Sequence, residues 1–73
     1  MSKQSSMMEN LIYEYEKLYN RGKKIDSTHD IYEKMAIIMG TLNKKHKVAV
    51  CCFAGYVEFF DMNSILPIYS FKK

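Results

Sequence analysis

The chain has 73 residues, of which 48% are hydrophobic, and it carries six Tyr, four Phe and a net charge of +3. This composition is that of a folding sequence and excludes an intrinsically disordered one. The length allows one domain, residues 1–73, and a domain of this size buries only about 60% of the surface that its unfolded chain exposes. It therefore needs further stabilisation from disulfides, a metal or oligomerisation.

The N-terminus predicts a short flexible segment over residues 1–6, followed by a helix over residues 7–22. Ser6 and Glu9 have the spacing of a capping box, in which each side chain accepts a hydrogen bond from the other residue's backbone N–H. Gly22 is placed where a left-handed residue ends a helix. The apolar side chains between these ends recur with a helical period; they are Met8, Leu11, Ile12, Tyr15, Leu18 and Tyr19.

A second helix is predicted over residues 28–43. Its apolar residues cover more than half of its circumference, which is typical of a helix that is buried on two sides. Gly40 costs up to about 1 kcal/mol relative to Ala inside a helix, and indicates that another backbone approaches closely there. The apolar residues are Ile31, Tyr32, Met35, Ala36, Ile37, Ile38, Met39 and Leu42.

Residues 46–72 favour three antiparallel strands, because Val, Cys, Phe and Tyr are enriched there. We expect strands over residues 46–53, 56–62 and 65–71, with Ala54 and Gly55 forming a two-residue turn in which Gly55 has a positive φ. Pro67 cannot donate a ladder hydrogen bond, which makes the third strand an edge strand. The predicted fold class is α+β, with the order ααβββ.

The stretch VAVCCFAGYVEFF, residues 48–60, hardly alternates between apolar and polar residues. A strand with one face in water alternates clearly, so both faces of this sheet need to be covered. Two helices can cover one face only. The simplest remedy for the other face is a sheet-to-sheet homodimer, although a domain swap or an obligate partner protein also serves.

Cysteine and histidine usage gives no sign of a disulfide framework, a metal site or a cofactor. Cys51 and Cys52 are adjacent and cannot bond to each other without a strained ring; this indicates a reducing, intracellular compartment. Zinc needs four well-placed ligands, whereas the chain offers these two cysteines and two distant histidines, His29 and His46. No apolar run spans a bilayer and no signal peptide is present, so we predict a cytoplasmic protein without a membrane segment.

Four residues are candidates for binding a partner protein. Tyr13 lies off the apolar face of the first helix, and tyrosine is enriched at interface hot spots. Glu58 is a carboxylate between Val57 and Phe59, where a charge would specify a partner. Tyr56 and Phe60 alternate with these apolar residues and so share a face with Glu58. No pair of carboxylates, phosphate-binding loop or nucleophile with a base is recognisable, which indicates that the protein is not an enzyme.

The basic residues suggest an alternative function, because lysine clusters neutralise phosphates. Two of the clusters follow the predicted helices, where cations are also favoured by the helix dipole. The alternative is therefore a small nucleic-acid-binding regulator. A third possibility is a sponge for a small anionic ligand held between subunits. The candidate contact residues are Arg21, Lys23, Lys24, Lys44, Lys45 and Lys47.

The general character of the chain is similar to that of small accessory proteins of phages and mobile elements. It is short, rich in Lys, Ile, Asn and Tyr, and without a catalytic motif. Such proteins act by blocking a host protein. This similarity implies a stoichiometric protein–protein inhibitor or adaptor, which is the function we expect for this chain.

Overall fold

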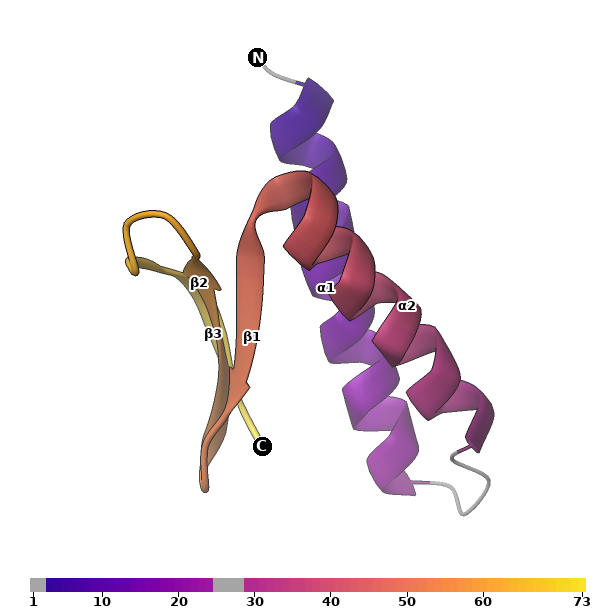
Figure 1. Ribbon diagram of the computed structural model, residues 1–73. Coiled ribbons are helices and arrows are strands. Elements are labelled where there is room, and N and C mark those ends of the chain that lie inside the picture. The colour runs from indigo at the N-terminus through magenta and orange to yellow at the C-terminus, as the bar shows by residue number, and fades with distance from the viewer. Residues whose placement is uncertain (1–2, 25–28) are drawn as a thin grey trace.

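The computed structural model describes residues 3–24 and 29–73. Helix α1 spans Lys3–Lys24 and helix α2 spans His29–His46. Three strands follow: β1 Val48–Cys52, β2 Tyr56–Asp61 and β3 Pro67–Lys72. Both helices lie on the same side of the sheet (Figure 1). The predicted α+β class and the order ααβββ are confirmed.

The helix ends differ from the sequence-based expectation. Helix α1 already begins at Lys3, so Ser6 lies inside the helix and is not its capping residue. Lys3 and Gln4 are good helix formers, and residues 3–6 contain no Gly or Pro. Gly22 also lies inside α1 and does not have a positive φ. Helix α2 continues to His46, because basic residues in the last turn are favoured by the helix dipole, and Lys47, with a φ of 56°, provides the left-handed residue that follows.

The sheet is an antiparallel meander with the order β1-β2-β3. Strand β1 is shorter than predicted, because α2 retains His46. The Phe53 N–H donates to the Tyr56 carbonyl oxygen at 2.8 Å, so Ala54 and Gly55 form the predicted two-residue turn between Phe53 and Tyr56. The positive φ predicted for Gly55 is wrong: all three glycines lie in described segments, and none has a positive φ. Pro67 opens β3, which is an edge strand as expected.

The core lies between the helices and one face of the sheet. Phe59, in the central strand β2, has no exposed surface and packs edge-on against Tyr15 of α1, with ring centroids 5.6 Å apart. Tyr19 packs similarly against Phe71 at 5.5 Å. Such aromatic pairs contribute about 0.5–1.5 kcal/mol each beyond the area they bury. Over the residues described, neither helix is long and apolar enough to cross a bilayer.

The turn between β2 and β3 holds one residue in an unfavourable conformation. Ile65 has a φ of 57°, a left-handed value that is an outlier for a β-branched residue and costs on the order of 1–3 kcal/mol. Hydrogen bonds enforce it: the Ile65 N–H donates to the Asp61 carbonyl oxygen at 2.7 Å, and the Asp61 N–H donates to the Leu66 carbonyl oxygen at 2.9 Å. The Ile65 side chain is 75% exposed and gains little from packing.

The substitution Ile65→Asn is expected to raise the free energy of unfolding by about 1 kcal/mol, because Asn tolerates the left-handed conformation far better than a β-branched residue. Urea denaturation measures the change. Leu66→Asn is the matched control, since Leu66 is also exposed but lacks a positive φ, and it should bring no gain. Equal stability of the two variants would contradict the strain at Ile65.

Candidate functional site

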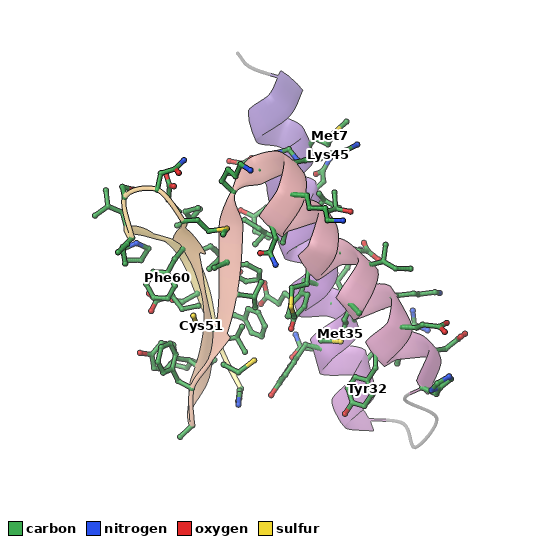
Figure 2. All side chains as sticks on the ribbon, viewed as in Figure 1. Met7, Tyr32, Met35, Lys45, Cys51 and Phe60 are labelled. Atoms are coloured by element: carbon green, nitrogen blue, oxygen red, sulfur yellow. The ribbon has the colours of Figure 1, made fainter. Side chains whose placement is uncertain are left out.

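The face of the sheet that points away from the helices is the main candidate, and we call it the outer face. Successive side chains of a strand alternate between faces. Because Val48, Val57, Phe59 and Phe71 are buried beneath the helices, their neighbours point outward, and Figure 2 shows Phe60 directed away from the helical layer. The outer face consists of Ala49, Cys51, Phe53, Tyr56, Glu58, Phe60, Ser70 and Lys72.

Large apolar side chains dominate the outer face. Phe53 and Tyr56 stack across the turn between β1 and β2, with ring centroids 4.9 Å apart and planes 22° apart. Phe53 and Tyr56 are each about two-fifths exposed, at 40% and 41%, and Phe60 is half-buried. No helix of the described chain covers these side chains (Figure 1). The outer face is therefore an accessible apolar surface.

Glu58 lies in the middle of this surface. It belongs to the central strand, and its cross-strand neighbours are Cys51 in β1 and Ser70 in β3. Neither neighbour is a cation. Lys72, on the same face, lies two residues beyond Ser70 along β3 and opposite Tyr56. The carboxylate thus stands among apolar groups without a cation directly across from it.

Tyr13 does not belong to the outer face. It projects from α1, is 49% exposed, and packs edge-on against Tyr69 at 5.3 Å. A hollow of about 80 Å³ between α1 and β3 is lined by Met8, Glu9, Ile12, Tyr13, Ile68 and Tyr69. The structure therefore brings together three of the predicted partner-binding residues, Tyr56, Glu58 and Phe60, and places Tyr13 apart from them, on α1 beside Ile68 and Tyr69 of β3.

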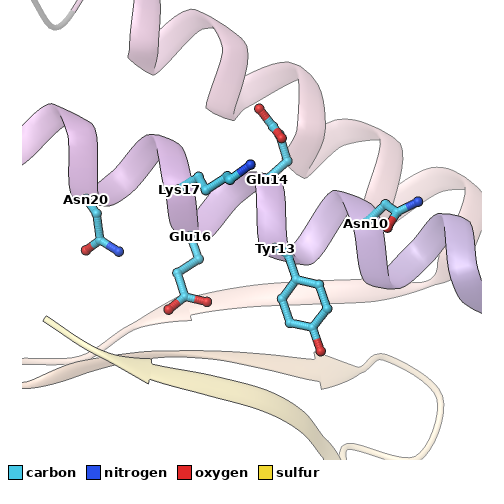
Figure 3. A pocket seen from close by; sticks show the side chains of 6 residues that line it. All are labelled: Asn10, Tyr13, Glu14, Glu16, Lys17 and Asn20. Atoms are coloured by element: carbon cyan, nitrogen blue, oxygen red, sulfur yellow. The ribbon is translucent and has the colours of Figure 1, made fainter.

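The largest polar groove near Tyr13 does not assemble catalytic groups. Figure 3 shows that Glu16 and Tyr13 point toward the sheet, whereas Glu14 and Lys17 point away from it. The two carboxylates therefore do not converge on a common point. The groove has a volume of about 390 Å³ and is lined by Asn10, Tyr13, Glu14, Glu16, Lys17 and Asn20. Within the described segments, no three His, Cys, Asp or Glu side chains gather where they could hold a metal ion.

The basic residues are divided between the two ends of the helical layer. Lys44, Lys45 and Lys47 are exposed where α2 ends, and Figure 2 shows Lys45 near the N-terminal half of α1. Arg21 is exposed at the opposite end, near Gly22, whose side faces Ile31 of α2. The rise of about 1.5 Å per residue separates Ile31 from Lys45 by about 21 Å. The clusters do not form one patch.

Lys23 and Lys24, the other members of the Arg21 cluster, lie in α1, but their side chains fall outside the described residues.

Sequence reasoning missed three exposed apolar residues next to the outer face. Met62, Ile65 and Leu66 are 49%, 75% and 62% exposed in the turn between β2 and β3. Ile65 and Leu66 were expected to begin the third strand, but β3 starts only at Pro67. The signal was present in the sequence, since the first residue of a strand is one of the few positions that proline occupies in a sheet.

A partly buried hydrogen bond connects α1 to β3 beside Tyr13. The Tyr69 hydroxyl donates a hydrogen bond to Glu16 Oε1. This hydrogen bond, followed by burial, raises the pKa of Tyr69 to about 12. Burial is the main cause that raises the pKa of Tyr15 to about 12, with Cys52 and Tyr19 contributing.

In comparisons with protein-family models, curated proteins and solved structures, nothing matches this chain.

The substitution Glu16→Gln is expected to lower the pKa of Tyr69 from about 12 toward 10, because the charged acceptor is lost. The pKa of Tyr15, raised mainly by burial, serves as the internal control and should stay in place. A raised tyrosine pKa stabilises the fold below pH 10, and this contribution is lost as the pH rises from 10 to 12. Tyrosine ring NMR shifts against pH measure both groups, and an unchanged Tyr69 would contradict the role of Glu16.

Proposed function

We propose that this chain is a protein-binding module that acts by occupancy rather than by catalysis, as a stoichiometric inhibitor or adaptor. The observation that carries the proposal is the uncovered apolar outer face, on which three predicted partner-binding residues lie together. Contiguous apolar surface of this kind marks protein interaction sites. The sheet already has a packed core on its other face, so the outer face is not needed to complete the core.

The aromatic side chains of the outer face suit an interface. Tyrosine is enriched among hot-spot residues, which lie near the centre of an interface and lose their water on binding. The stacked pair Phe53 and Tyr56 limits the freedom of both rings before a partner arrives, which lowers the entropy cost of binding. Fully burying an apolar side chain of this size contributes about 1.5–3 kcal/mol.

Glu58 defines the chemistry of the partner. A carboxylate that is buried in an interface without a cation or hydrogen-bond donors costs several kcal/mol. The partner surface must therefore be apolar and must also bring an Arg or a Lys to Glu58. Charges placed in this way contribute to specificity by excluding partners that lack the complementary group.

Nucleic acid fits the same surface less well. The outer face presents the Glu58 carboxylate to any phosphate that approaches, and the candidate contact residues Arg21, Lys44, Lys45 and Lys47 are divided between opposite ends of the helical layer. The chain also contains one Arg, Arg21, although Arg is the residue best suited to bidentate contacts with phosphate or guanine. Nucleic acid is the competing outcome of the test below.

Affinity capture from a cell lysate with matched variants tests the proposal. Tyr56→Ala and Glu58→Lys are expected to reduce recovery of the partner protein at least about tenfold, which corresponds to about 1.4 kcal/mol. Tyr32→Ala, at a side chain that is 62% exposed on α2, is the matched control and should leave recovery unchanged. Recovery should also survive nuclease and high salt, because an apolar interface responds little to ionic strength.

The double variant Lys45→Glu, Lys47→Glu separates the two classes of partner. A protein partner held by the outer face stays bound to this variant. If recovery instead collapses with nuclease, with salt or with this variant, while Tyr56→Ala and Glu58→Lys bind normally, the protein-binding proposal is wrong and nucleic acid is the partner.

A further inference from the structure

The edge of the sheet formed by β1 lacks the features that normally protect edge strands. Edge strands usually carry Pro, Lys or other charges that discourage pairing with another chain. Strand β3 has Pro67 and Lys72. Strand β1, at the other edge, is VAVCC and contains neither a proline nor a charge. Strand β1 is thus the edge at which a further strand can add.

The hydrogen bonds of the hairpin show which backbone groups of β1 are unpaired. The Met62 N–H donates to the Lys47 carbonyl oxygen and the Phe53 N–H to the Tyr56 carbonyl oxygen, both at 2.8 Å. The direction of the backbone N–H and C=O groups alternates from residue to residue along an antiparallel strand. The backbone groups of Ala49 and Cys51 therefore also point toward β2. Val48, Val50 and Cys52 direct their N–H and C=O groups to the open edge, where no other strand of the described chain pairs.

Helix α2, which packs on β1, leaves one side uncovered. A Cβ added at Gly40 would meet nothing within 4 Å, and Ile37 is 67% exposed. The sequence indicates a close approach of another backbone at Gly40, yet in the described part of the molecule none comes near. The buried stripe of α2 lies on its other side; it consists of Ile31, Met35, Ile38 and Leu42.

We propose that two copies of this chain associate through β1, antiparallel and centred on Val50. This register pairs all five residues of β1 and opposes no two charges. It joins two three-stranded sheets into one and leaves both outer faces open on the same side. A stack of two outer faces with its two-fold axis near the centre of the sheet would instead bring two Glu58 carboxylates together, which is unfavourable.

The proposed register places Ala49 directly opposite Cys51 of the second copy. Both residues direct their backbone groups to β2, so they form the type of pair that shares no hydrogen bonds, with Cα atoms about 4.5 Å apart. This distance lies within the range in which a disulfide forms. A disulfide between position 49 and Cys51 therefore reports on the register directly.

Two single-thiol variants of the full chain provide the test. One is Cys52→Ser, which keeps Cys51, and the other is the triple variant Ala49→Cys, Cys51→Ser, Cys52→Ser. After the two are refolded together and oxidised, we expect a mixed disulfide dimer as the main product, while each variant alone remains uncrosslinked. The proposal is overturned if no mixed dimer forms, if Cys52→Ser crosslinks to itself equally well, or if the unmodified protein sediments at 8.6 kDa at the highest attainable concentration.

Discussion

The structure depends on the burial of Phe59 in the central strand of a sheet that has helices on one side only. Phe59 is fully buried and contacts Tyr15 of α1 as well as Tyr69 and Phe71 of β3. Since side chains alternate along β2, burial of Val57 and Phe59 beneath the helices fixes Tyr56, Glu58 and Phe60 on the opposite face. The candidate binding surface is thus a direct consequence of the core.

A chain of this length has too little material to cover both faces and both edges of a sheet. Three boundaries of the sheet stay exposed, the outer face and the two edges, and their side chains suit them to different uses. The edge of β3 carries Pro67 and Lys72, which discourage pairing. The edge of β1 carries neither, and the outer face combines aromatic rings with one carboxylate. Charge therefore distinguishes a surface suited to a different protein from an edge suited to a second copy.

Element order was predictable because its signals are local: helical periodicity in the first half and strand-forming residues in the second. The ends of the elements were less predictable, because competing interactions decide them. The capping-box spacing of Ser6 and Glu9 was present, but α1 extends past it to Lys3. Gly22 and Gly55 were expected to adopt positive φ values, whereas Lys47 and Ile65 do so instead, under the constraint of the α2–β1 junction and the hydrogen bonds to Asp61.

By itself, the sequence determined the fold class, the alternation that places Tyr56, Glu58 and Phe60 on one face, and an apolar content too large for one helical layer to cover. These properties follow from composition and from periods of 2 and 3.6 residues, which any segment carries within itself. Only the tertiary structure decided that Tyr13 lies apart from these residues, beside β3, that the lysine clusters are at opposite ends, and that Gly40 faces open space. Those are relations between segments distant in the chain, and they are set by how the two helices pack on the sheet.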